Sequence, residues 1–173
     1  PDFGSVSDFG DVALRAKMRL AGGEEGRPAL GARFAMALPQ TSFGNGLGPN
    51  TLRFSAQALL SLPTGRAWLH ANLGLALLDE PLRAHEQRDL VAYGVAAEVP
   101  LAGSLTLLAE AAGLAGDGAP GADARSEARA GLRGGPGRWR WDLALRRGLA
   151  DADGTWGLSA GLSWVLRPGR PAR

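Results

Sequence analysis

The chain has no cysteine, only two histidines and one tyrosine, and no long run of apolar residues. Without cysteine it has neither a disulfide framework nor a thiolate metal site, a composition compatible with an oxidising compartment. Without a run of about eighteen apolar residues, no transmembrane helix is expected. The 19 basic and 17 acidic side chains leave a formal net charge of only +2. We therefore do not read the high isoelectric point as a sign of nucleic-acid binding.

What the sequence does contain is a strict alternation of apolar and small or polar residues. It is clearest in residues 155–166, where glycine and serine separate Trp156, Leu158, Ala160, Leu162, Trp164 and Leu166. Successive side chains of a strand point to opposite faces, so this segment is predicted to be a strand with one apolar and one polar face. A strand that crosses a bilayer needs about 9–11 residues of this pattern, with aromatic residues near its ends.

The same period of two recurs along the whole chain. It predicts nine strands, at residues 12–20, 29–38, 51–62, 67–77, 91–99, 105–111, 125–133, 138–146 and 155–166. Short and long connections alternate between them, as in bacterial outer-membrane barrels with short periplasmic turns and long extracellular loops. We therefore predict an all-β fold, an antiparallel up-and-down transmembrane β-barrel that forms one domain over residues 1–173. Residues 1–8 are expected to be a loop or the end of a strand, and residues 167–173 a tail.

An odd number of strands conflicts with this topology, because single-chain bacterial barrels have even numbers and both ends in the periplasm. We expect one or three further strands before Pro1, which would make ten or twelve. The first and ninth segments would otherwise be unpaired edges, and lipid offers an exposed strand edge no hydrogen-bond partner.

Charged residues gather on the polar face. This set is predicted to line the lumen: Arg15, Lys17, Arg19, Arg33, Arg53, His70, Glu98, Glu110, Arg125, Glu127, Arg129, Arg133, Arg138, Arg140, Asp142 and Arg146. One interpretation is a pore that favours anions or polar solutes. The other is a network of ion pairs that plugs a narrow barrel, in which Glu110 and Asp142 each lie within reach of an arginine.

Three tryptophans favour a membrane barrel over a soluble barrel or sandwich. Trp139 and Trp164 lie at one end of the last two strands and Trp156 at the other, all on the apolar face. An interfacial aromatic girdle has this arrangement, whereas a soluble barrel would have to enclose all three rings. Trp139, Trp156 and Trp164 are therefore predicted to lie at the membrane interface, with leucines such as Leu143 and Leu158 facing lipid.

Candidate chemistry is sparse. His70 lies on the polar face with Ser55, Ser61 and Ser104 as possible neighbours, but no nucleophile-elbow sequence is present. His85 lies in a charged loop, residues 44–48 form a glycine-rich loop that opens no helix, and Asp151 and Asp153 lack the other ligands of a calcium loop. We predict no catalytic, cofactor or metal site, and hence a protein that is not an enzyme.

Several short stretches resemble a known family. They are residues 9–20 (FGDVALRAKMRL), 62–65 (LPTG), 69–74 (LHANLG) and 147–151 (RGLAD). These are similar to the outer-membrane β-barrels described as phenol-degradation (meta-pathway) or transporter proteins. The resemblance implies passage of hydrophobic or aromatic small molecules. Such proteins usually end in an aromatic residue, whereas this chain ends in LRPGRPAR.

The sequence thus predicts a barrel in the bacterial outer membrane of a Gram-negative-type cell. Its expected partners are the lipid bilayer and small hydrophobic or anionic solutes, with no nucleic acid. A porin-like passive channel or binding barrel is the preferred function. The alternatives are a structural barrel with a charge-plugged lumen and a barrel enzyme that acts on lipid.

Overall fold

The computed structural model describes residues 11–24, 26–40, 51–79, 86–116, 125–150 and 154–164. Nine β-strands account for most of them: β1 (Val12–Gly22), β2 (Ala29–Leu38), β3 (Arg53–Thr64), β4 (Ala67–Asp79), β5 (Gln87–Pro100), β6 (Thr106–Ala115), β7 (Arg125–Gly134), β8 (Trp139–Gly148) and β9 (Trp156–Trp164). Within these ranges there is no helix of the length and hydropathy needed to cross a bilayer.

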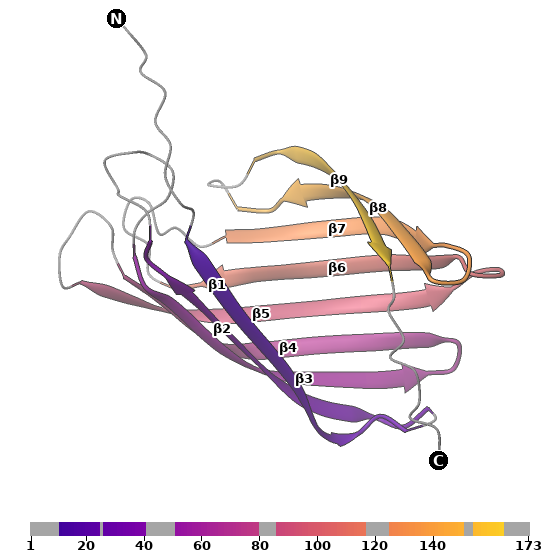
Figure 1. Ribbon diagram of the computed structural model, residues 1–173, viewed down its shortest axis with the longest axis horizontal. Helices are drawn as coiled ribbons and strands as arrows, with labels where there is room; N and C mark the ends of the chain where they lie inside the picture. Colours follow the sequence, from indigo (N-terminus) through magenta and orange to yellow (C-terminus); the bar gives the residue numbers. More distant parts are fainter. Residues whose placement is uncertain are drawn as a thin grey trace, which may run out of the picture.

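The strands form one antiparallel sheet in the order of the chain, β1 to β9, each paired with the next (Figure 1). This confirms the predicted all-β, up-and-down arrangement. The sheet is open, however, because no pairing joins β1 to β9 among the described residues. The nine described strands therefore form a curved open sheet and not a closed barrel, which agrees with the expectation that they are part of a larger barrel.

Strand boundaries differ most from the prediction at β5 and β6, which are longer than the alternating segments. Gln87 pairs with Asp79 and Leu114 with Ala92, so the ladder continues beyond the alternating apolar residues. The reverse occurs at Arg138, which lies in the turn before β8 instead of on the strand. Backbone pairing therefore extends where the side-chain pattern is already lost.

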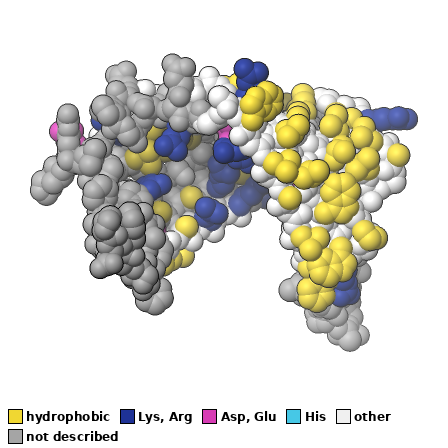
Figure 2. Space-filling model, turned by 90° about the horizontal axis from the view of Figure 1, so that it is seen from above, with side chains coloured by type: hydrophobic (Ala, Val, Ile, Leu, Met, Phe, Trp, Pro, Cys, Tyr) yellow, Lys and Arg dark blue, Asp and Glu magenta, His cyan; other side chains and the backbone are white. Residues whose placement is uncertain are grey.

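The sheet is bent into a trough whose two faces differ in composition. Figure 2 shows lysine and arginine side chains inside the hollow and hydrophobic side chains on the outer surface of one arm. Every large, exposed hydrophobic residue within the nine described strands lies on the convex face, including Leu143 (48%), Leu145 (59%), Leu158 (68%) and Leu162 (70%). The predicted exposure of these four leucines is confirmed.

Glycine allows the strands to approach closely on the concave face. A Cβ atom on Gly74 would lie 1.9 Å from the carbonyl oxygen of Ala56, and one on Gly131 would lie 2.3 Å from that of Leu143. Both contacts are to the backbone of the neighbouring strand, which cannot turn aside as a flexible side chain can. The close approach of the strands at these two points thus depends on residues without a side chain.

The only tightly packed apolar cluster of the described residues also lies on the concave face. Ala76, Leu90 and Ala92 are buried there, with Leu78 and Leu114 packed against them. The alternation predicted which residues share this face, but treated it as the polar one. The concave face is apolar near the end of β4 and the start of β5, where this cluster lies, and carries charged side chains elsewhere.

Candidate functional site

A network of ion pairs crosses the concave face from β5 to β8. Arg129 contacts Glu127 on its own strand, and its Nη1 lies 3.3 Å from Oε1 of Glu110 on β6. Glu127 also accepts a hydrogen bond from Nη1 of Arg146 on β8, at 3.3 Å. The prediction that Glu110 lies within reach of an arginine is confirmed. These groups are partly exposed, so the network matters more than any single pair.

Asp142 departs from the predicted pairing, since no arginine of the described residues lies within ion-pair distance of it. Its register partner on β7 is Arg133, but Nη1 of Arg133 lies 3.5 Å from Oε1 of Glu98 on β5 instead. The Asp142 carboxylate lies over Gly161, where a Cβ would come within 2.7 Å of Oδ1. The long arginine side chain therefore reaches past its cross-strand neighbour.

The wall formed by β1 to β3 is cationic. Its concave positions carry five basic side chains: Arg15, Lys17, Arg19, Arg33 and Arg53. No carboxylate occupies a concave position of these three described strands. Lys17 lies directly opposite Arg33, whose guanidinium donates to Oε1 of Gln57. Like charges directly opposite each other destabilise a pair of strands, so the pairing of Lys17 with Arg33 opposes the stability of this wall.

Two hollows open on this wall. One, of about 270 Å³, lies over the apolar cluster and has Arg15 and Arg53 at its edge. The other, of about 510 Å³, is lined by Lys17, Arg19 and Trp68, among others. Both combine positive charge with an apolar surface.

His70 lies in the larger hollow, on β4, and its ring is held on two sides. Nδ1 lies 2.8 Å from Oγ of Ser61 on β3, and the ring stacks on that of Trp68 with centroids 6.4 Å apart. Of the three serines named from the sequence, Ser61 is its partner. The tight turn at Gly65–Arg66 pairs Thr64 with Ala67, and counting back along the ladder from there would have predicted this contact.

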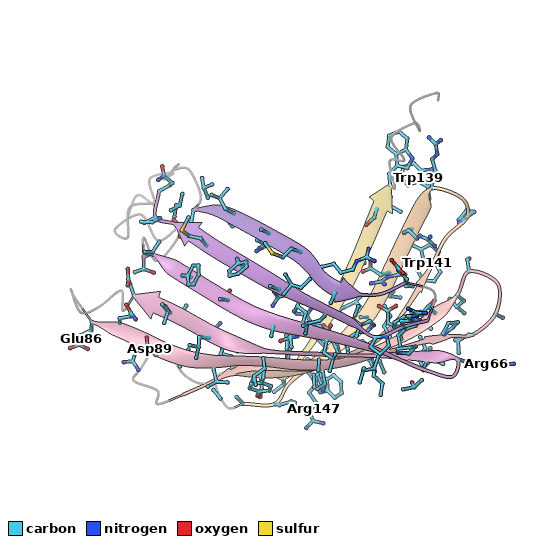
Figure 3. All side chains as sticks on the ribbon, turned by 90° about the horizontal axis from the view of Figure 1, so that it is seen from below. Arg66, Glu86, Asp89, Trp139, Trp141 and Arg147 are labelled. Atoms are coloured by element: carbon cyan, nitrogen blue, oxygen red, sulfur yellow. The ribbon has the colours of Figure 1, made fainter. Side chains whose placement is uncertain are left out.

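The three tryptophans predicted at the membrane interface are exposed on the convex face at strand ends. Trp139 and Trp164 pair across β8 and β9 and stack, with centroids 6.0 Å apart. Trp156 lies at the other end of β9, with the guanidinium of Arg147 5.3 Å from its ring centroid. Figure 3 shows Arg147 pointing away from the trough and Trp139 at the tip of one arm. This placement is the one an interfacial girdle requires.

Several sequence-based expectations fall outside the described residues: the glycine-rich loop 44–48, His85, Asp151, Asp153, and residues 1–8 and 167–173. The other predicted lumen residues of β1 to β8 lie at concave positions of the described strands, apart from Arg138 in its turn. No group of three or more acidic or histidine side chains in the described part of the chain is arranged to hold a metal ion.

No family model, no curated protein and no solved structure matches this chain. The geometry of the trough is therefore the basis for any functional conclusion.

Proposed function

We propose that the chain forms the wall of a bacterial outer-membrane β-barrel that binds or passes small anionic or hydrophobic solutes along its cationic concave face. The convex face supports the membrane location. In the described strands its only charged side chains are Asp79, Asp89 and Arg147, all near the long loops. An uncharged band bordered by aromatic and charged residues is the lipid-facing pattern of outer-membrane barrels.

The wall formed by β1 to β3 and the wall formed by β5 to β8 differ in charge. This difference is the observation that supports an anionic solute. On β5 to β8 most of the basic side chains near the centre have acidic partners, through Glu98, Glu110 and Glu127. On β1 to β3 the concave positions of the described strands carry five basic side chains and no carboxylate. A pore lined by unpaired cations favours anions, whereas a wall of ion pairs favours neither sign.

We expect the full-length protein in planar bilayers to conduct with a preference for anions. Replacing both Arg15 and Arg53 with glutamine should lower the anion-to-cation permeability ratio towards one, measured as the reversal potential in a salt gradient. Arg147→Gln is the matched control, because Arg147 lies on the convex face and should leave the ratio unchanged. A channel whose selectivity responds equally to both changes, or absence of conductance, would contradict passage along this wall.

The ion-pair network favours a second candidate, a structural barrel whose lumen is closed by charge pairs. The two candidates differ in their response to Glu110→Gln, which removes one of the two carboxylates at Arg129. If the pair closes the lumen, this variant should increase single-channel conductance and lower the denaturation midpoint. If Glu110 only tunes selectivity, the reversal potential should move towards anions with the midpoint unchanged. Ser163→Ala, a neutral change on the same face, is the control.

A further inference from the structure

The Ser61–His70 pair has the geometry of an activated nucleophile. Oγ of Ser61 lies 2.8 Å from Nδ1 of His70, which can accept the hydroxyl proton when Nε2 carries the ring proton. A hydroxyl within hydrogen-bond reach of an imidazole is the arrangement that generates a serine nucleophile. The two residues lie directly opposite each other on β3 and β4, so the sheet itself holds them in register.

The other ring nitrogen faces a carboxylate. Among the described residues Nε2 of His70 is buried without a hydrogen-bond partner, and it lies 4.0 Å from Oε1 of Glu98 on β5, the oxygen that Arg133 also contacts at 3.5 Å. The His70 ring also stacks on that of Trp68, with an angle of 10° between the ring planes. A carboxylate on the far side of the imidazole stabilises the positive charge that the ring gains when it takes a proton. Serine, histidine and glutamate thus follow one another across three neighbouring strands.

The hollow beside this pair can receive a substrate. It is lined by Ser61 and His70 together with the apolar side chains of Leu59 and Trp68 and the cations Lys17 and Arg19. The apolar side chains suit an acyl or alkyl group, and the cations suit a negative charge, either on the substrate or on the oxyanion that forms during acyl transfer.

We propose that Ser61, His70 and Glu98 form an esterase site for small carboxylic esters that carry a negative charge. Ser61 Oγ attacks the ester carbonyl carbon while its proton passes to Nδ1 of His70. The bond from that carbon to the ester alkoxy oxygen breaks, and the alcohol leaves with the proton from Nδ1. Water then attacks the carbonyl carbon of the acyl-serine while its proton passes to Nδ1 of His70. The bond from that carbon to Ser61 Oγ breaks, Oγ takes the proton back from Nδ1, and the carboxylic acid is released. Glu98 is a positioning residue that acts through His70.

Lys17 and Arg19 belong both to this hollow and to the cationic wall, but Ser61 and His70 contribute no charge to that wall, so the assay of ester hydrolysis is distinguishable from the measurement of solute passage. The probe is mono-4-nitrophenyl succinate, an anionic ester, with neutral 4-nitrophenyl acetate for comparison, added to the full chain folded in detergent micelles. Release of 4-nitrophenolate should exceed that of Ser61→Ala and of His70→Gln by about 10²–10⁴-fold. The anionic ester should be preferred, and Lys17→Gln should remove this preference.

Ser55→Ala is the matched control, because Ser55 lies on the same strand and face without a histidine partner and should retain the full rate. A fluorophosphonate should label Ser61, as shown by mass spectrometry of the peptide, and labelling should disappear in His70→Gln. Glu98→Gln should lower kcat for the anionic ester and leave KM unchanged, because Glu98 acts through His70 and does not contact the substrate, and Glu98→Asp should restore part of kcat. Equal hydrolysis by the wild type and Ser61→Ala, or a folded protein that the fluorophosphonate leaves unlabelled at Ser61, would overturn the proposal.

Discussion

Leu143→Arg is expected to lower the free energy of unfolding in a phospholipid bilayer by about 2–4 kcal/mol. Leu143 lies near the middle of β8 on the convex face, is 48% exposed, and pairs with Leu132 on β7 and Ala160 on β9. A guanidinium at that position would have to enter the apolar band that we propose faces lipid. The measurement is equilibrium unfolding by guanidinium chloride in liposomes, with tryptophan fluorescence as the signal that reports the folded fraction.

The control for this prediction puts the same side chain on the other face. Ser159 lies on the concave face of β9, where its hydroxyl donates only a long hydrogen bond of 3.5 Å to the carbonyl oxygen of Ala144. Ser159→Arg should therefore cost much less than Leu143→Arg. If the two variants were equally destabilised, or if Leu143→Arg were tolerated, the convex face would be in contact with water and the membrane proposal would fail.

The alternation of residues predicted the nine strands and the face of nearly every side chain, because a strand has only two faces. It could not predict whether the sheet closes. Closure depends on curvature and on the pairing of the two edges, β1 and β9, and neither depends on which face a residue occupies. That further strands join these edges stays a prediction. Disulfide crosslinking between Met18→Cys and second cysteines introduced one at a time elsewhere in the full-length protein would identify the strand that lies beside β1.

The candidate site was predictable as a set of residues but only partly as a set of contacts. The pairing of Ser61 with His70 follows from a two-residue turn close by in the chain. The pairing of Arg133 with Glu98 in place of Asp142 does not, because a long side chain can reach past its cross-strand neighbour. Contacts between short side chains close to a tight turn are therefore the ones that a sequence predicts best.

Gly74→Ala is the second change with a large expected effect, because the added methyl group would meet backbone. Its Cβ would lie 1.9 Å from the carbonyl oxygen of Ala56 and 2.6 Å from the Cα of Gln57, both on β3. Relief requires β3 and β4 to separate, which weakens the ladder next to Gln57, a buried residue that accepts a hydrogen bond from Arg33. We expect a loss of about 1–3 kcal/mol or more in the free energy of unfolding.

Gly161→Ala tests whether contact with the neighbouring backbone causes the loss of stability expected for Gly74→Ala. It is the same substitution on the same concave face, but its Cβ would meet only the carboxylate of Asp142, at 2.7 Å from Oδ1. That carboxylate has no ion-pair partner among the described residues and can rotate away, so the free energy of unfolding should change by no more than about 0.5 kcal/mol. Equal losses in the two variants would contradict contact with the neighbouring backbone as the cause. A loss confined to Gly74→Ala would show that the close approach of the β3 backbone to Gly74 is the cause, so that the pairing of β3 with β4 at this point requires a residue without a side chain.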